Sequence, residues 1–423
     1  MTLTDPLHYA PKGDKANSAY FNEYRVKIYE RRIKSGLADL LGNMCGLVIQ
    51  VQTGDALAYL KELCIMTPYR YSKSYINNTH KIYCLVNSNT PNTPVFFVLE
   101  PLAFDFADQL TYVNKMYVNS QEKPNARYVG EIFSTKDRNE TKKILLSHEI
   151  RFQDPDSIQN KFYSNKHIEF TQMSNISLNS LGYTDSNIYD FDSLELGEEF
   201  HLSPTEKKAL EEVDQFTQEH QIKPLLKGVD HTASRVLAGE REDAILEWLC
   251  LSNYYFWGAY DVKDLNSSTN ASRITHGNDI LSPAKVFTAN NTPFMVNSFE
   301  NLPMPTENFV RNYGRRLHHL AIEVMDGEYQ KGTKNIDFVL KKLTDDAHIP
   351  FLSQIYGECK DEPNLRQVFS KHSAFSILIT EYIERCNDFK GFFTKSNVFA
   401  LTTAAESDEQ IKTHHIGHGV VGD

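Results

Sequence analysis

Two histidines on related segments and a glutamate among isoleucines are the residues best suited to chemistry in this sequence. His231 lies in GVDHTASRV (228–236) and His319 in RLHHLAIEV (316–324), and both segments carry the pattern H-x-A-x-charge-V. Side chains alternate along a strand, so each His shares a face with a small Ala that leaves room beside the imidazole. Glu381, in ILITEYIER, shares its face with isoleucines, where a carboxylate is costly unless it is paired or metal-bound.

Together these three residues have the composition of a metal site. Two imidazoles and one carboxylate leave three adjacent positions open on an octahedral ion, an arrangement that suits Fe(II) enzymes binding both a substrate and O₂. The residues alone leave an alternative open, namely two hydrogen-bonded core histidines and a salt-bridged glutamate. On the neighbouring positions we expect His318 to face away from the site and Glu384 to be solvated.

The elements that must position these residues repeat. His231 and His319 are 88 residues apart, and each opens a predicted strand that leads into a predicted amphipathic helix, at 240–252 and at 335–346. Such self-similarity predicts two copies of a β-α-β-β-β module that pair into one curved sheet around a pocket. Further strands are predicted at 253–262, 284–290, 293–299, 351–358 and 375–385.

The first half also mixes helices and strands. A helix is predicted at about 17–41 and another at 137–150, while Ser203 and Glu206 form a capping pattern that predicts a helix start between the halves. Strands are predicted at 46–52, 81–87, 94–102, 126–133 and 166–173. We therefore expect an α+β protein with a helical N-terminal segment (1–40), a first domain (41–200), a helical connection (201–226), a second domain (227–406) and a flexible His-containing tail (407–423).

Composition narrows the function classes. The 44 Lys and Arg against 55 Asp and Glu give a net charge of −11, which argues against binding a nucleic-acid backbone. No stretch approaches the ~18 apolar residues of a membrane span. The six cysteines form no C-x-x-C pair, so we expect them to be reduced in a cytoplasmic protein.

The second half, roughly 226–406, resembles the vicinal-oxygen-chelate superfamily and, within it, the 4-hydroxyphenylpyruvate dioxygenases. That family carries a D-H motif on a module's opening strand, here Asp230-His231. It carries an H-[IL]-A-[IL] motif, here 319–322, and an E-x-I-x-R motif before a G-F segment, here 381–385 and 391–392. All three occur in the family's order.

The resemblance implies two domains, each of paired βαβββ modules forming a curved, partly closed sheet around a pocket. It implies Fe(II) held by His231, His319 and Glu381, with the first domain a degenerate copy without metal. The substrate would be a small α-keto acid that chelates the iron, and its oxidative decarboxylation with O₂ would drive oxidation of the rest of the same molecule. No nucleic acid or membrane partner is implied, and the oligomeric state stays open.

Several positions around the implied substrate depart from the family pattern. Lys285, in KVFTAN, replaces the family's polar residue before V-x-A-N, and the lid segment after Gly391 lacks two later glycines. Residues 359–373 form an insertion, preceded by a match to the family's Q-I-F strand at 354–356. The expected substrate-binding residues are Arg235, Lys285, Ser298, Glu300, Gln354, Phe392 and Phe393. The changes predict that the distal part of the substrate differs from hydroxyphenyl.

Alternatives remain at this stage. Arg235 could bind a substrate carboxylate, but an ion pair with Glu323, its counterpart in the repeat, is favoured. On the same scaffold the chain could also be an extradiol ring-cleaving dioxygenase, an isomerase, a lyase or a non-catalytic ligand-binding protein. Metal identity and dependence on O₂ separate these functions, and the complete set of three ligands argues against a pure binding protein.

Overall fold

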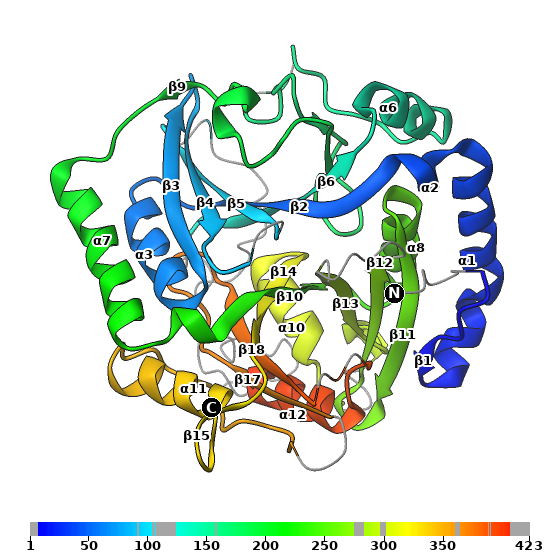
Figure 1. The fold of residues 1–423 in the computed structure, drawn as a ribbon. Coiled ribbons are helices and arrows are strands. Elements are labelled where there is room, and N and C mark those ends of the chain that lie inside the picture. Colours follow the sequence, from blue (N-terminus) through cyan, green and yellow to red (C-terminus); the bar gives the residue numbers. More distant parts are fainter. Residues whose placement is uncertain are drawn as a thin grey trace, which may run out of the picture.

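Two eight-stranded sheets form the scaffold of the molecule (Figure 1). The computed structural model describes residues 7–90, 93–103, 106, 124–156, 158, 160–274, 283–296, 302–359, 364–387, 389 and 391–406. The order of the first sheet is β7-β8-β6-β2-β5-β4-β3-β9, and that of the second is β1-β11-β12-β13-β10-β14-β18-β17. The predicted α+β class with curved sheets is confirmed.

The first sheet comes from the N-terminal half of the chain. Its strands are β2 (Leu41–Gln50), β3 (Tyr69–Ile76), β4 (His80–Asn87), β5 (Val95–Pro101), β6 (Arg127–Thr135), β7 (Glu169–Phe170), β8 (Gly182–Thr184) and β9 (Glu198–Glu199). The helices of this half are α1 (Lys15–Ser35), α2 (Leu37–Leu40), α3 (Ala56–Met66), α6 (Arg138–Ser147) and the 3₁₀ helix η2 (Phe191–Leu194).

The second sheet comes mainly from the C-terminal half. Its strands are β1 (Lys12–Gly13), β10 (Leu226–Arg235), β11 (Tyr254–Val262), β12 (Ser267–Ile274), β13 (Ala284–Asn290), β14 (Arg316–Val324), β17 (Asn364–Phe369) and β18 (Ile379–Cys386), and β15 (Glu328–Gln330) pairs separately with β16 (Thr333–Lys334). The helices are α7 (Pro204–Glu219), η3 (Lys223–Leu225), α8 (Arg241–Leu251), η4 (Lys263–Leu265), α10 (Pro305–Tyr313), α11 (Asn335–Asp345) and α12 (Lys395–Glu406).

The module pattern explains both sheets. The series β2-α3-β3-β4-β5 and β10-α8-β11-β12-β13 are complete β-α-β-β-β modules, and each is followed by a shorter second copy that opens with β6 or β14. In both sheets the two opening strands pair antiparallel at the centre, and the last strand of each module pairs parallel with its own opening strand. This repeat places β10, β14 and β18 side by side in the middle of the molecule (Figure 1).

Local sequence chemistry accounts for the helix that joins the halves. The Ser203 hydroxyl accepts from the amide of Glu206 while the Glu206 side chain accepts from the amide of Ser203, with Pro204 in the first turn. This reciprocal cap satisfies donors that a helix start would otherwise leave unpaired. The predicted helix start is confirmed. No helix among the described residues is both long and apolar enough to cross a membrane.

Three strand predictions need correction. Residues 351–358 make isolated bridges through Phe351 and Tyr356, and the edge strand is β17, which lies inside the predicted insertion. The strand predicted at 166–173 shortens to β7, and residues 294–296 within the strand predicted at 293–299 are helical. The first two errors occur at sheet edges, where strand pairing with a partner from elsewhere in the chain decides the outcome more than the local pattern does.

Candidate metal centre

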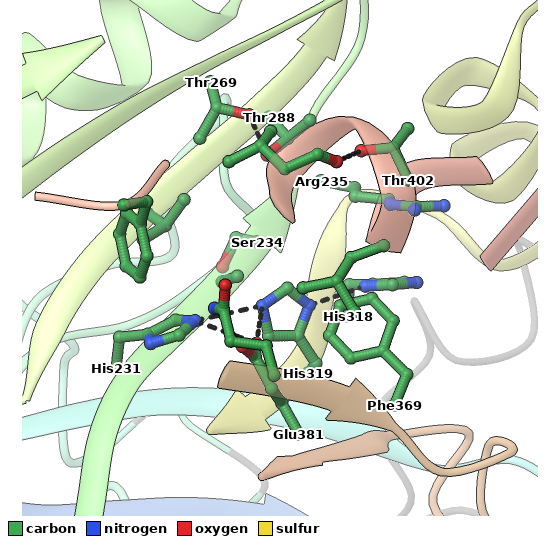
Figure 2. Close-up of a pocket in the computed structure, with 16 residues that line it drawn as sticks. His231, Ser234, Arg235, Thr269, Thr288, His318, His319, Phe369, Glu381 and Thr402 are labelled. Atoms are coloured by element: carbon green, nitrogen blue, oxygen red, sulfur yellow. Dashed lines mark hydrogen bonds and ion pairs between the residues drawn. The ribbon is translucent and has the colours of Figure 1, made fainter. Parts of the chain in front are cut away.

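Three adjacent strands bring His231, His319 and Glu381 together. In the register of the sheet, Ala321 on β14 pairs with His231 on β10 and with Glu381 on β18, while Ala233 pairs with His319. Since neighbouring residues across a sheet share a face, all three side chains point to the same side, and Figure 2 shows them converging. The small alanines between them leave the space into which they point.

The three donor atoms form a nearly equilateral triangle. The two Nε2 atoms of His231 and His319 are 3.3 Å apart, and Glu381 Oε2 lies 3.1 Å from the first and 3.3 Å from the second. With bonds of about 2.0–2.2 Å, adjacent ligand atoms lie about 3.0 Å apart around an octahedral ion and about 3.4 Å apart around a tetrahedral one. The triangle therefore fits one face of a first-row metal's coordination shell.

A buried ion pair orients His231. Asp230 Oδ1 lies 2.8 Å from His231 Nδ1, and Arg385 donates to the same carboxylate through Nε at 2.7 Å and a terminal nitrogen at 3.0 Å. An Nδ1–H that donates to a carboxylate leaves Nε2 as the free lone pair, which fixes the tautomer a metal needs. This contact gives the aspartate of the D-H motif and the arginine of the E-x-I-x-R motif a physical role that the sequence analysis did not assign.

The charges of the site are strongly coupled. Burial opposes ionisation of Asp230, but Arg385 and His231 outweigh it and hold the pKa of the carboxyl well below its usual range. Burial likewise opposes protonation of His231, yet Glu381 and Asp230 raise its pKa to about 9. Burial and then the neighbouring His231 lower the pKa of His319 well below its ordinary value. Without a metal, a proton bound by the two histidines therefore resides on His231 and not on His319.

Gln367 on β17 supports the carboxylate. Its Nε2 donates to Glu381 Oε1 at 2.5 Å, and its Oε1 accepts from Asn397 Nδ2 on α12 at 2.9 Å. The other carboxylate oxygen, Oε2, is thereby left to face the two histidines. Gln367 was not predicted from the sequence, although Gln367-Val368-Phe369 repeats the Q-apolar-aromatic pattern of residues 354–356.

Above the donor atoms lies a cavity of about 60 Å³. Because a water molecule needs about 10–15 Å³ by this measure, the cavity holds only a few non-hydrogen atoms. Phe369 packs on His319 with ring centroids 4.8 Å apart, and Phe393 packs on His231 at 4.9 Å. Val398 and Leu401 of α12 complete the apolar wall, so helix α12 covers the site.

Some expected substrate residues line this cavity. Arg235 does so, and its guanidinium donates to the Pro305 carbonyl and lies over the ring of Phe309. The favoured pair with Glu323 is wrong, because β10 and β14 are antiparallel and place the two residues at opposite ends; Glu323 instead pairs with Lys227 at 2.7 Å.

Among the other expected substrate residues that the structure describes, only Phe393 lines the cavity. Phe392 packs on Trp257 with ring centroids 4.9 Å apart. Gln354 is exposed and lies away from the cavity. Ser298 and Glu300 lie outside the described residues.

Lys285 belongs to the opposite face of the sheet. In the parallel pairing of β13 with β10 it stands beside Thr232, so it points toward the first sheet, where its ammonium lies 2.5 Å from Glu131 and also donates to Ser234. Val286 and Thr288, which do line the cavity, are its neighbours of the other parity. Alternation along AKVFTAN could have indicated this arrangement from sequence.

Three further expectations fail. A register shift between Ala233 and Ser234 leaves His318 as the extra residue of β14, so it also lines the cavity, with Nδ1 2.8 Å from Nδ1 of His319. Glu384 is fully buried rather than solvated. The expectation of reduced cysteines is wrong for one pair, because Cys359 and Cys386 form a disulfide.

Comparison with known proteins gives a structural match without a sequence match. No protein-family model and no curated protein sequence matches the chain. A triple mutant of 4-hydroxymandelate synthase from Streptomyces coelicolor superposes with a TM-score of 0.59 over 87% of this chain and 98% of that chain, at 13% identity. The chain shares that enzyme's fold.

A second solved structure agrees. A xylose isomerase-like TIM barrel/4-hydroxyphenylpyruvate dioxygenase fusion protein matches with a TM-score of 0.54 and 11% identity, over 94% of this chain and 60% of that one. At these identities the likeness establishes the architecture, and the predicted resemblance to the vicinal-oxygen-chelate fold is confirmed at that level.

Proposed function

We propose that this chain is a non-haem Fe(II) dioxygenase acting on an α-keto acid, with His231, His319 and Glu381 as the metal ligands. The observation that carries the proposal is the buried triangle of two imidazole nitrogens and one carboxylate oxygen, with sides of 3.1–3.3 Å. The solved structures that share the fold add support, since their names include 4-hydroxymandelate synthase and 4-hydroxyphenylpyruvate dioxygenase.

The donor set favours this chemistry over simple metal storage. Two neutral imidazoles and one carboxylate leave a bound ion with positive charge and three adjacent open positions. When bound, Fe(II) would offer positions for both O₂ and a keto-carboxylate and would pass electrons from the substrate to O₂. In the overall reaction O₂ and the keto acid yield CO₂, with one oxygen atom in the new carboxylate and the other in the oxidised remainder of the same substrate.

Residues around the triangle then have distinct tasks. Arg235 lines the cavity and carries a guanidinium of the kind that binds carboxylates in bidentate fashion. Phe369 and Phe393 flank the two histidines and exclude water from the reacting atoms. Gln367 and Asp230 hold Glu381 and His231 in the orientation that the ligand set needs.

The cavity also bears on the substrate. Its volume of about 60 Å³ accommodates a keto-carboxylate group, so a ring at the distal end requires Phe393 or α12 to shift outward. The predicted change of distal group had rested partly on Lys285, which lies on the other face of the sheet. We therefore base the expected change of the substrate's distal group on the altered lid, in which Phe393 and α12 close over the site.

Metal analysis of protein purified without oxygen is the first test. We expect one iron per chain, loss of iron in His231→Ala, His319→Ala and Glu381→Ala, and retention in Glu323→Ala, a carboxylate on β14 that pairs with Lys227. Retention of iron in any of the three ligand variants at the wild-type level would contradict the assignment.

Oxygen uptake with a panel of aryl and alkyl pyruvates is the second test. We expect O₂ consumption and CO₂ release in equal amounts with at least one member. Turnover that needs a metal but no O₂ would indicate an isomerase or lyase, and uptake confined to catechols would indicate ring cleavage. Efficient conversion of 4-hydroxyphenylpyruvate to homogentisate, with kcat/KM near the ~10⁴ M⁻¹s⁻¹ low end of ordinary enzymes, would refute the altered substrate.

A further inference from the structure

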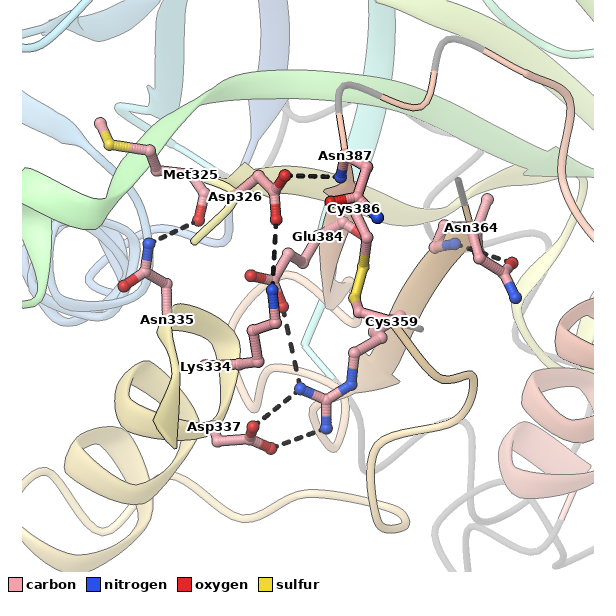
Figure 3. The surroundings of a disulfide bond; sticks show 12 residues. Met325, Asp326, Lys334, Asn335, Asp337, Cys359, Asn364, Glu384, Cys386 and Asn387 are labelled. Atoms are coloured by element: carbon pink, nitrogen blue, oxygen red, sulfur yellow. Dashed lines mark hydrogen bonds and ion pairs between the residues drawn. A yellow bond between two sulfur atoms is a disulfide. The ribbon is translucent and has the colours of Figure 1, made fainter. Parts of the chain in front are cut away.

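A second group of metal-binding side chains lies on the other face of β18. Cys386 ends that strand and forms a disulfide with Cys359, with Cα atoms 5.6 Å apart. The two sulfur atoms and a carboxylate oxygen of Glu384 all lie within 4.8 Å of one another (Figure 3). Glu384 and Cys386 have the opposite parity to Glu381, so this group is separated from the first centre by the sheet itself.

Glu384 is a buried carboxylate with only weak partners among the described residues. It is 0% exposed, neither of its oxygens accepts a hydrogen bond of regular geometry there, and the backbone N–H of Gly327 gives only a weak contact that lowers its pKa. The nearest guanidinium, that of Arg366, is 3.8 Å away and directs its two terminal nitrogens to Asp337 at 2.7 and 2.8 Å. An ionised group buried in this way is costly, and a bound ion is one of the few explanations that chemistry offers.

We propose that reduction of this disulfide creates a second metal site, in which Cys359, Cys386 and Glu384 bind a divalent ion of the zinc class. A dithiol reductant supplies two electrons and two protons to the disulfide and becomes a disulfide itself, leaving two thiols. The ion then displaces both thiol protons and takes two thiolates and one carboxylate, with a water in the fourth position. In the reverse direction the oxidised dithiol accepts two electrons from the two thiolates and takes up two protons, which re-forms the Cys359–Cys386 disulfide and releases the ion.

The surroundings suit that occupant. Two thiolates and a carboxylate carry −3, so a divalent ion leaves −1. Arg366 and Lys334 stand nearby, and each is also paired with an aspartate, Asp337 and Asp326 respectively. Burial raises the pKa of the Glu384 carboxyl to about 7, so without an ion its charge is only partly expressed at neutral pH. Cys359 is half-buried, which gives a reductant access to the pair.

Ligand softness distinguishes the two centres. The first offers nitrogen and oxygen, while the second offers two sulfurs, which select zinc-like ions over hard ones. Metal binding at the two sites can therefore be measured independently, and the proposal of the second site does not depend on whether the first is catalytic. They remain physically linked through Arg385, which lies between Glu384 and Cys386 and holds Asp230.

Anaerobic titration with Co²⁺ tests the proposal directly, because thiolate ligation produces a near-ultraviolet charge-transfer band that a nitrogen and oxygen site lacks. The reduced His231→Ala protein, in which the first centre is removed, should show this band at one Co²⁺ per chain, and Zn²⁺ should bleach it. The oxidised protein should show none. Cys359→Ser and Cys386→Ser should each abolish the band, and Glu384→Gln should weaken Co²⁺ binding at least tenfold.

Cys250→Ser is the matched control, since Cys250 is a partly buried free cysteine elsewhere, and it should keep the band. Circular dichroism verifies folding, and the comparison of reduced with oxidised His231→Ala protein needs no substitution at the second site. Absence of the band after thiol counting confirms reduction would overturn the proposal. So would a band that survives Cys386→Ser, or Co²⁺ affinity unchanged in folded Glu384→Gln protein.

Discussion

Asp230→Asn is the sharpest test of how the first centre is held together. The substitution keeps the side chain's shape but removes a buried charge that accepts from His231 at 2.8 Å and from Arg385 at 2.7 and 3.0 Å. An amide presents one acceptor where the carboxylate presented two. It therefore cannot satisfy both partners, and its NH₂ group favours the wrong tautomer of His231.

Two magnitudes follow. Loss of a partner that orients a metal-bound histidine typically weakens metal affinity 10–100-fold, or about 1.4–2.8 kcal/mol. Arg385 is left as a buried charge without its counter-ion, which costs about 3–5 kcal/mol of folding stability. The metal-free variant should thus unfold at a lower denaturant concentration than the wild type, and the double variant Asp230→Asn/Arg385→Gln should lose less than the sum of the single variants.

The measurement is anaerobic competition for Fe²⁺ against a chromophoric chelator, made with the Cys359–Cys386 disulfide intact so that the second site is closed. Asp337→Asn is the matched control, because Asp337 forms a similar bidentate pair with Arg366 away from His231. If Asp230→Asn bound Fe²⁺ within about twofold of the wild type while folded, the orienting role of Asp230 would be wrong.

Three further changes have defined outcomes. Gln367→Met removes the donor to Glu381, so iron affinity should fall about tenfold with little loss of secondary structure; an unchanged chelator titration would contradict its role. Lys285→Met leaves Glu131 buried without its ion-pair partner. We expect this to lower the free energy of unfolding by about 3–5 kcal/mol in denaturant experiments without changing iron affinity. A changed KM for the substrate would instead support the substrate-binding role that the sequence predicted for Lys285. Burial raises the pKa of Glu384 to about 7, so the ionised carboxylate should lower the free energy of unfolding of the oxidised protein by up to about 3 kcal/mol above pH 7. This loss should shrink as the pH falls and vanish below the unfolded-state pKa near 4.5. Glu384→Gln should abolish this pH dependence in unfolding experiments, and its persistence would refute the cause.

Periodicity in the sequence predicted the frame of the second sheet and the faces of its central strands. The repeat of His231 and His319 indicated paired modules, and alternation placed both histidines and Glu381 on the inner face. This worked because a strand's side chains alternate with a period of two wherever the pairing is regular. The same rule applied to AKVFTAN would have turned Lys285 away from the cavity.

What the sequence could not determine depends on partners far away in the chain. Gln367 belongs to the site because β17 pairs with β18, a choice between two segments with similar patterns that only the sheet edge resolves. His318 reaches the cavity because the pairing shifts by one residue between Ala233 and Ser234.

The burial of Glu384 likewise depends on tertiary structure. Residues on the outer face of a strand are solvated unless another element covers them, and the sequence around Glu384 does not say which element does so. In the folded chain Arg366 of β17 and Cys359 lie beside this carboxylate, and Cys386 comes within bonding distance of Cys359. Alternation is a local property of one strand and can be read from sequence, whereas register, edge pairing and covering come from contacts between distant segments that only the folded chain brings together.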